Sequence, residues 1–242
     1  KDDMPKYLLF LENAFPYMDN YNYHKGMKGI IQELKVLLKT KSIGTDSDRA
    51  LLLDFQAALE TQPEKAIKLE KNALAQIENI TADNARLVSN LHANLGGLYR
   101  MNGYPDLARE HMEKSISLLD QFNLLHINDS IPQIANYAMF LTEQQEPERG
   151  ISELQKLSGI IKEYHSDDCL DYAKVQETLG TIYLMTANLP QAKTHFKRAF
   201  KIYEKIWADE PEMIEAKYQE IQELYPQIGF SIGKTLSGLL TK

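Results

Sequence analysis

Proline recurs in this chain at a fixed interval of 42 residues. The prolines that define the interval are Pro63, Pro105 and Pro147, and Pro190 follows one residue late. Two further columns, one mostly aliphatic and one small, repeat with the same step of 42 residues: Leu53, Leu95, Tyr137 and Leu179, and Ala66, Ala108, Gly150 and Ala192. A period of this length predicts an array of similar structural units, each packed on its neighbours.

Each unit is predicted to be a hairpin of two helices. Leu95, Leu98 and Tyr99 fall at i, i+3 and i+4, which is the spacing of a helix face. The following segment 102–105, Asn-Gly-Tyr-Pro, breaks the helix, since glycine can end one helix and proline suits the first turn of the next. The small column predicts close contact between two backbones. A third column is small at three of its four places: Asp54, Gly96, Ala138 and Gly180.

The spacing of small and aromatic residues resembles a known repeat. A glycine, a tyrosine three positions later and an alanine twelve positions after the glycine occur twice, as Gly96, Tyr99 and Ala108, and as Gly180, Tyr183 and Ala192. This pattern is similar to the tetratricopeptide repeat, and the 42-residue period resembles the extended repeats of kinesin light chain. The resemblance implies an all-α fold, a right-handed superhelix of about five helix hairpins with atypical terminal helices.

The repeat divides the chain into one predicted solenoid domain, residues 1–242. Residues 1–40 are expected to form an N-terminal helical cap or a degenerate repeat, with helices at 4–18 and 21–39. A degenerate repeat follows at 46–80, regular repeats at 83–122, 128–164 and 168–207, and C-terminal capping helices at 211–242. The start of the sequence favours an intracellular fragment, or a chain trimmed at its N-terminus.

The composition and net charge limit the classes of molecule that this segment is expected to bind. The net charge of −7, with acids and bases interspersed, disfavours nucleic acid as the partner of this segment. No apolar run reaches the length of a membrane-spanning helix. The one cysteine excludes an internal disulfide framework and favours a cytoplasmic location. The oligomeric state stays open.

The sequence predicts no catalytic residues, no metal site and no cofactor. The segment His165-Ser166-Asp167-Asp168-Cys169 holds metal-ligating residue types, but its place between repeats favours a loop in which Asp168 caps the next helix. Glu12 and Asp54 are flanked by apolar residues, the setting that raises a carboxyl pKa. Neither has a catalytic partner in the sequence, so both are interpreted as departures from the small column in degenerate units.

The predicted site is a peptide-binding groove on the first helices of the third to fifth repeats, which the resemblance implies line the concave surface. Asn94 and Asn136 are 42 residues apart, and an amide can hold a peptide backbone because it both donates and accepts hydrogen bonds. The alternative is that they are ordinary exposed polar residues. The predicted peptide-binding residues are Asn90, Asn94, Gly97, Arg100, Met101, Asn136, Met139, Lys174, Thr178 and Thr181.

These features favour a non-catalytic protein- or peptide-binding scaffold that uses the concave groove. Arg100 and Lys174 would hold acidic groups of the ligand, or serve as solubilising charges. The alternative function is a peptide-sensing regulatory domain of a bacterial transcription regulator, whose DNA-binding part lies outside this chain. An accessory role beside an enzyme is a third interpretation.

Overall fold

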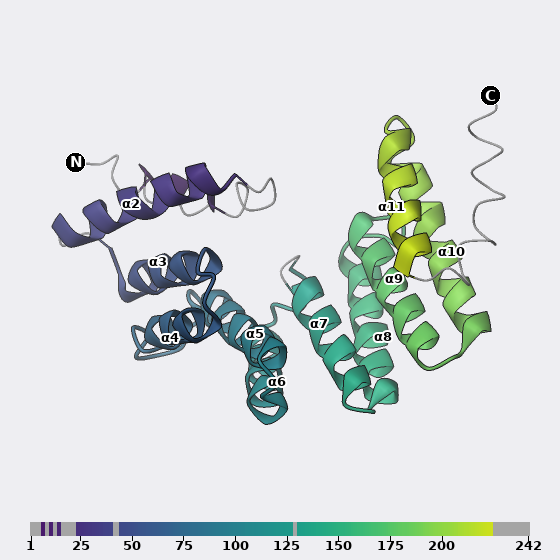
Figure 1. Cartoon of the computed structure of the whole chain (residues 1–242), viewed down its shortest axis with the longest axis horizontal. Helices are drawn as coiled ribbons and strands as arrows, with labels where there is room; N and C mark the ends of the chain where they lie inside the picture. Colours follow the sequence, from purple (N-terminus) through teal and green to yellow (C-terminus); the bar gives the residue numbers. More distant parts are fainter. Residues whose placement is uncertain are drawn as a thin grey trace. The chain divides into compact units, whose positions relative to one another are not determined.

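The computed structural model describes residues 6–7, 10–11, 14–15, 23–40, 44–127 and 130–224, and within them it contains ten α-helices and no strand (Figure 1). Glu12, most of the predicted first helix and the predicted final helix lie outside the described residues. The chain divides into two compact units, Lys1–Leu124 and Leu125–Lys242, each described here by itself. That residues 1–242 form one continuous solenoid stays a prediction.

From residue 23 onward, the described part of the first unit contains one single helix and two hairpins. Its helices are α2 (His24–Thr40), α3 (Asp46–Ala58), α4 (Pro63–Leu74), α5 (Ala85–Met101) and α6 (Pro105–Gln121). Helix α3 pairs with α4 and α5 pairs with α6, as Figure 1 shows, and α4 also packs on α5. Helix α2 packs on α3, and the ring of Phe15, which precedes α2 in the sequence, stacks on that of Phe55 in α3 with the centroids 3.9 Å apart.

The second unit repeats the hairpin plan. Its helices are α7 (Ser130–Glu143), α8 (Pro147–Tyr164), α9 (Leu170–Met185), α10 (Leu189–Ile206) and α11 (Pro211–Leu224). Helix α7 pairs with α8 and α9 with α10, while α8 packs on α9 and α11 packs on α10 (Figure 1). The predicted all-α class and hairpin plan are thus confirmed for the described residues.

The predicted turn chemistry is present between the paired helices. Pro63, Pro105 and Pro147 are the first residues of α4, α6 and α8. Gly103 has a φ of 76°, the left-handed conformation expected where α5 ends. Two of the three hairpins without a glycine in the turn place other residues in this conformation: Gln145 with φ 65° and Ala187 with φ 60°.

The prediction that Asp168 caps α9 is wrong. The cap is Cys169, whose Sγ accepts a hydrogen bond from the Tyr172 backbone N–H at 3.4 Å. The Asp168 carboxylate instead pairs with Lys205 of α10. Because both residues lie at the start of the helix, a shift of one residue decides which side chain reaches the orphan N–H groups of the first turn.

Small residues allow the paired helices to approach closely, as the repeat columns predict. A Cβ added at Gly150 would lie 2.6 Å from the carbonyl oxygen of Ala138. A Cβ at Gly96 would lie 2.6 Å from Cγ of Met112, and one at Gly180 would lie 2.9 Å from the Phe196 ring. These glycines therefore set the spacing of α5/α6, α7/α8 and α9/α10.

Candidate functional site

The predicted groove residues of the first unit lie along α5. Asn94 is exposed, and Met101 is 83% exposed at the end of the helix. Gly97 has nothing within 4 Å of where a Cβ would lie, so the surface beside it is open. Asn90 and Arg100 are half-buried and engaged in contacts. This face of α5 thus offers one exposed amide and one exposed apolar side chain.

The predicted groove residues of the second unit lie along α7 and α9, which contact each other. Asn136 is exposed and Met139 half-buried on α7. Lys174 is exposed on α9, 4.0 Å from Asp171. The hydroxyls of Thr178 and Thr181 donate to carbonyl oxygens one turn earlier in α9, at 2.9 and 3.1 Å. Since each hydroxyl has one hydrogen, neither donates to a ligand in this arrangement.

Asn94 and Asn136 belong to different units, so their action as one ladder stays a prediction. Within the first unit, Asn94 already has partners. Its Nδ2 donates to Oδ1 of Asp54 at 2.8 Å and lies 3.3 Å from Oε1 of Glu70. Three consecutive helices, α3, α4 and α5, therefore meet at an acidic cluster formed by Asp54, Glu70 and Asn94.

The two carboxyls of the acidic cluster hold protons more tightly than exposed carboxyls do. Glu70 is only 2% exposed, and its Oε2 has no hydrogen-bond partner among the described residues. Burial, then the charge and hydrogen bond of Asp54, raise the pKa of Glu70 to about 10. Burial also raises the pKa of Asp54, against the hydrogen bonds from Glu70 and Asn94. We infer that the pair keeps one proton at neutral pH.

The cluster links α3, α4 and α5 through contacts within the chain. A protonated carboxyl can act as a general acid only if it reaches a substrate, and Glu70 is buried. The sequence analysis identified Asp54 and missed Glu70. The sequence could have identified Glu70, because the equivalent positions at intervals of 42 residues are all apolar: Met112, Leu154 and Phe196.

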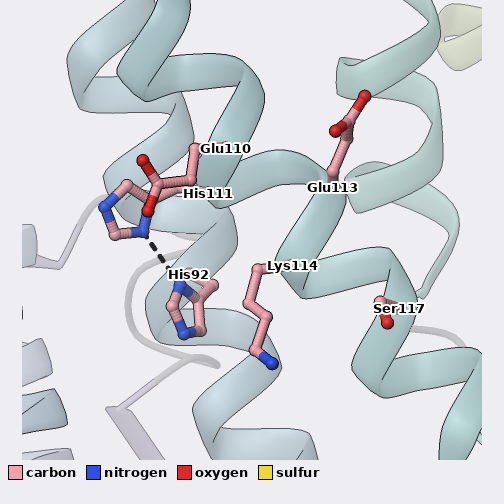
Figure 2. A pocket seen from close by; sticks show the side chains of 6 residues that line it. All are labelled: His92, Glu110, His111, Glu113, Lys114 and Ser117. Atoms are coloured by element: carbon pink, nitrogen blue, oxygen red, sulfur yellow. Dashed lines mark hydrogen bonds between the residues drawn. The ribbon is translucent and has the colours of Figure 1, made fainter.

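A second polar cluster joins α5 and α6. Figure 2 shows the rings of His92 and His111 turned toward each other, with their Nδ1 atoms 2.9 Å apart. Together with Glu110, Glu113, Lys114 and Ser117 they line a pocket of about 430 Å³. Burial and the neighbouring His111 and Lys114 lower the pKa of His92 to about 4, and burial also lowers the pKa of His111.

The histidine pair has an equivalent 84 residues later. There His195 of α10 lies with Nδ1 2.9 Å from Oε1 of Gln176 in α9. The ring of His195 stacks on Tyr183, as His111 stacks on Tyr99. The repeated arrangement indicates that both pairs are hydrogen bonds between the helices of a hairpin. Among the described residues, no group of three or more His, Cys, Asp or Glu side chains is placed to hold a metal ion.

Glu177 links three helices of the second unit. Tyr203 of α10 donates its hydroxyl to Oε2 at 2.6 Å, and Nζ of Lys217 in α11 lies 2.8 Å from Oε1. The bonds to Glu177 and Glu220 raise the pKa of Lys217 despite its burial. This half-buried carboxylate therefore fixes α11 against α9 and α10, and it is occupied within the chain.

The comparisons with known proteins agree with this architecture. The tetratricopeptide repeat family model matches residues 130–205. A crystal structure of a kinesin light chain from Podosopora anserina with nearly identical TPR-like repeats is similar, at 13% identity and a TM-score of 0.61, over 84% of this chain and 98% of that one.

Two further solved structures have the same fold. BtubC (BKLC) from P. vanneervenii is 16% identical with a TM-score of 0.62, over 97% of this chain and 91% of that one. MamA is 16% identical with a TM-score of 0.51, over 77% of this chain and 94% of that one. The search of curated proteins gives no match.

The described helices include none that is both long and apolar enough to cross a membrane. Helix hairpins repeat through both units, and the family match covers the two regular hairpins of the second unit. Residues 130–205 therefore match the tetratricopeptide repeat family, and the chain has the fold of kinesin-light-chain-like repeat proteins.

Proposed function

We propose that this chain is a non-catalytic protein-binding scaffold that holds a peptide segment of its partner on the first helices of its hairpins. The fold supports the general part of this proposal, a protein-binding scaffold, since arrays of this kind present extended binding surfaces. The specific part, a peptide held on the first helices, is supported by the α7/α9 face of the second unit. It combines the exposed Asn136 and Lys174 with the half-buried Met139 on two helices in contact.

This face has the chemistry that an extended peptide requires. The amide of Asn136 can pair with a peptide backbone, and Met139 offers adaptable apolar surface. Lys174 can hold an acidic group, because its own side chain is exposed and its ion pair with Asp171 is long and is worth little. A cytoplasmic location and a protein or peptide partner belong to this proposal. The regulator alternative stays a prediction, favoured by no specific contact.

The test is selection of a random peptide library on the parent chain and on an Asn136→Ala/Lys174→Ala variant. Asn94 is left unchanged because it bonds the buried acids. The control is Gln155→Ala/Lys197→Ala, which removes one amide and one lysine from exposed positions on the second helices α8 and α10. All three proteins must have equal melting temperatures.

We expect peptides that the parent and the control retain and the Asn136→Ala/Lys174→Ala variant loses. Retention by that variant would move peptide binding away from α7 and α9. Equal loss from the control would indicate binding without a defined site. If no protein enriches any peptide, the peptide-binding function is wrong.

A further inference from the structure

A pocket of about 640 Å³ opens between α2 and the α3/α4 hairpin. Helix α2 contributes one stripe, in which Gln32, Lys35, Val36 and Lys39 follow helical spacing. Helix α3 contributes Arg49, Leu52 and Leu53, again at i, i+3 and i+4. Two helix faces thus line one pocket, and α5, α7 and α9, which carry the predicted peptide surface, do not line it.

The floor of this α2–α3 pocket is aliphatic. Leu38 and Leu52 pack against the core cluster around Met27 and Leu34, whereas Leu53 packs against a separate cluster that includes Leu91. The pocket lies where these two cores stay separate. Val36 is 51% exposed on its wall, so apolar surface there faces solvent. A volume of this size with aliphatic walls is typical of small-molecule sites.

The rim of the pocket carries one sign of charge. The charged residues that line it in the described part of the chain are Lys35, Lys39 and Arg49, with no acid among them, although acids outnumber bases in the chain by 34 to 27. Arg49 is held in place by Gly44, whose carbonyl oxygen accepts from Nη1 at 3.2 Å, and it lies 3.5 Å from the exposed Asp46. The lysine stems can cover apolar surface while their ammonium groups face water.

The lining chemistry distinguishes between occupants. A peptide would bring backbone N–H and C=O groups that need partners. Among the described residues, the uncharged polar side chains of the lining are Gln32 and Gln76, and none of the lining side chains is an aromatic ring that could anchor a peptide. An aliphatic chain that ends in one anionic group needs only apolar walls and a cationic rim.

We propose that the α2–α3 pocket binds a fatty-acid-like carboxylate. Its aliphatic chain lies against Val36, Leu38, Leu52 and Leu53, and its carboxylate lies at the rim between the lysines of α2 and Arg49 of α3. Charge-assisted hydrogen bonds from these cations hold the head group. The pocket is separate from the proposed peptide surface, so an experiment that contradicts one proposal leaves the other standing.

Isothermal titration calorimetry of the full chain with sodium dodecanoate tests the proposal. Hexanoate has the same head group and a shorter chain, and dodecyltrimethylammonium has the same chain with a cationic head. The rim variant is Lys35→Glu/Lys39→Glu. Its matched control is Lys197→Glu/Lys201→Glu on α10, which has the same i, i+4 spacing, exposed side chains and change of charge. Val36→Ser tests the wall without altering charge.

We expect dodecanoate to bind the parent and the α10 control equally. The rim variant should bind at least about tenfold more weakly, since two attractive contacts become repulsive. Val36→Ser and the shorter hexanoate should weaken binding because less apolar surface is buried. Dodecyltrimethylammonium should bind at least about tenfold more weakly than dodecanoate.

Three results would overturn the proposal. The first is no binding of dodecanoate at about 1 mM. The second is equal binding by the parent and both the rim and Val36→Ser variants, which would place the amphiphile elsewhere. The third is retention of the parent, but not the rim variant, on phosphatidylserine vesicles without binding of dodecanoate. That pattern would assign the surface to a membrane.

Discussion

The hairpins α3/α4 and α5/α6 place different chemistry at the same position of the repeat. In α5/α6, Gly96 of the first helix leaves room for the Met112 side chain of the second. In α3/α4, the residues 42 positions earlier are Asp54 and Glu70, two carboxyls in contact. Asn94, from the next hairpin, donates a hydrogen bond to Asp54.

The comparison shows that the same contact between the two helices of a hairpin can be made in two ways, by an apolar pair or by a pair of carboxyls. An apolar pair needs only space, which a glycine provides, and it is complete within its own hairpin. A pair of buried carboxyls needs a retained proton and an outside hydrogen-bond donor, because desolvation opposes its charge. The α3/α4 hairpin is therefore tied to α5 by a polar contact as well as by packing, at some expected loss of stability.

The largest effect on stability is expected from adding a side chain where the two helices of an apolar hairpin approach each other closely. Gly150→Ala places a Cβ 2.6 Å from the Ala138 carbonyl oxygen. Overpacking of this kind should exceed the gain in helix propensity and lower the free energy of unfolding by about 2 kcal/mol. Urea unfolding measures the change.

Gly159→Ala in the same helix is the control, since no atom lies within 4 Å of its added Cβ. It should stabilise the protein by up to about 1 kcal/mol through helix propensity. A double variant, Ala138→Gly/Gly150→Ala, should not recover the loss, because the added Cβ meets the Ala138 backbone, which that substitution leaves in place. Equal effects of Gly150→Ala and Gly159→Ala would mean that the close approach is not required.

The second prediction converts one hairpin into the other. Asp54→Gly/Glu70→Met installs the pair that α5/α6 already uses, with the same alanine column opposite it. We expect the free energy of unfolding at pH 7 to rise by about 1 to 2 kcal/mol, since replacing buried charge by apolar side chains is often stabilising. Asn94 is exposed, so water replaces its lost acceptors. Guanidinium unfolding checks this, and a loss of stability would show that the acidic cluster is the better fit.

The third prediction concerns the pH dependence of the same pair. Glu70 has a folded pKa of about 10 against an ordinary value of 4.5, so the folded state retains a proton that the unfolded chain releases. Stability from this proton is complete below pH 4.5 and is lost as pH rises toward 10. The parent should therefore lose stability steadily between pH 5 and 8 relative to Asp54→Gly/Glu70→Met, by at most about 1.4 kcal/mol per pH unit. A constant difference across this range would contradict the shared proton.

The repeat columns predicted much of this fold because each position of the hairpin has one local requirement. Prolines begin α4, α6 and α8, since a first helical residue needs no N–H, and glycine ends α5. These are effects within one turn of the chain. The small column likewise identified the close crossings, although it did not say which member of each crossing must be glycine.

The acidic cluster could be predicted only in part. Asp54 was recognised as an exception in its column, but its partners lie 16 and 40 residues away in sequence on two other helices. Their meeting depends on how the hairpins pack. For the same reason the sequence did not reveal that the Nδ2 of Asn94 has two carboxyls as partners in the folded chain, and the role of Asn94 in peptide binding stays a prediction. The predicted cap of α9 was wrong by a single residue, because the local backbone geometry decides which side chain reaches the first turn of the helix.

The smallest effect is expected from exchanging the two interhelical polar pairs. His92→Gln gives α5/α6 the amide-to-imidazole pair of α9/α10, so the hydrogen bond to His111 remains and stability at pH 7.5 should change by no more than about 0.5 kcal/mol. His92 has a folded pKa of about 4, below its ordinary 6.5, so its contribution is complete above pH 6.5 and is lost as pH falls toward 4.

The variant should consequently become more stable than the parent by about 0.5 kcal/mol at pH 5.5, because one of the two imidazoles that resist protonation has been removed. The converse substitution, Gln176→His, should give α9/α10 the acid sensitivity that α5/α6 loses. Thermal melts at pH 7.5 and 5.5 measure both. If neither exchange alters the difference between the two pH values, the paired imidazoles titrate as isolated ones do, and the equivalence of the two hairpins at this position is geometric only.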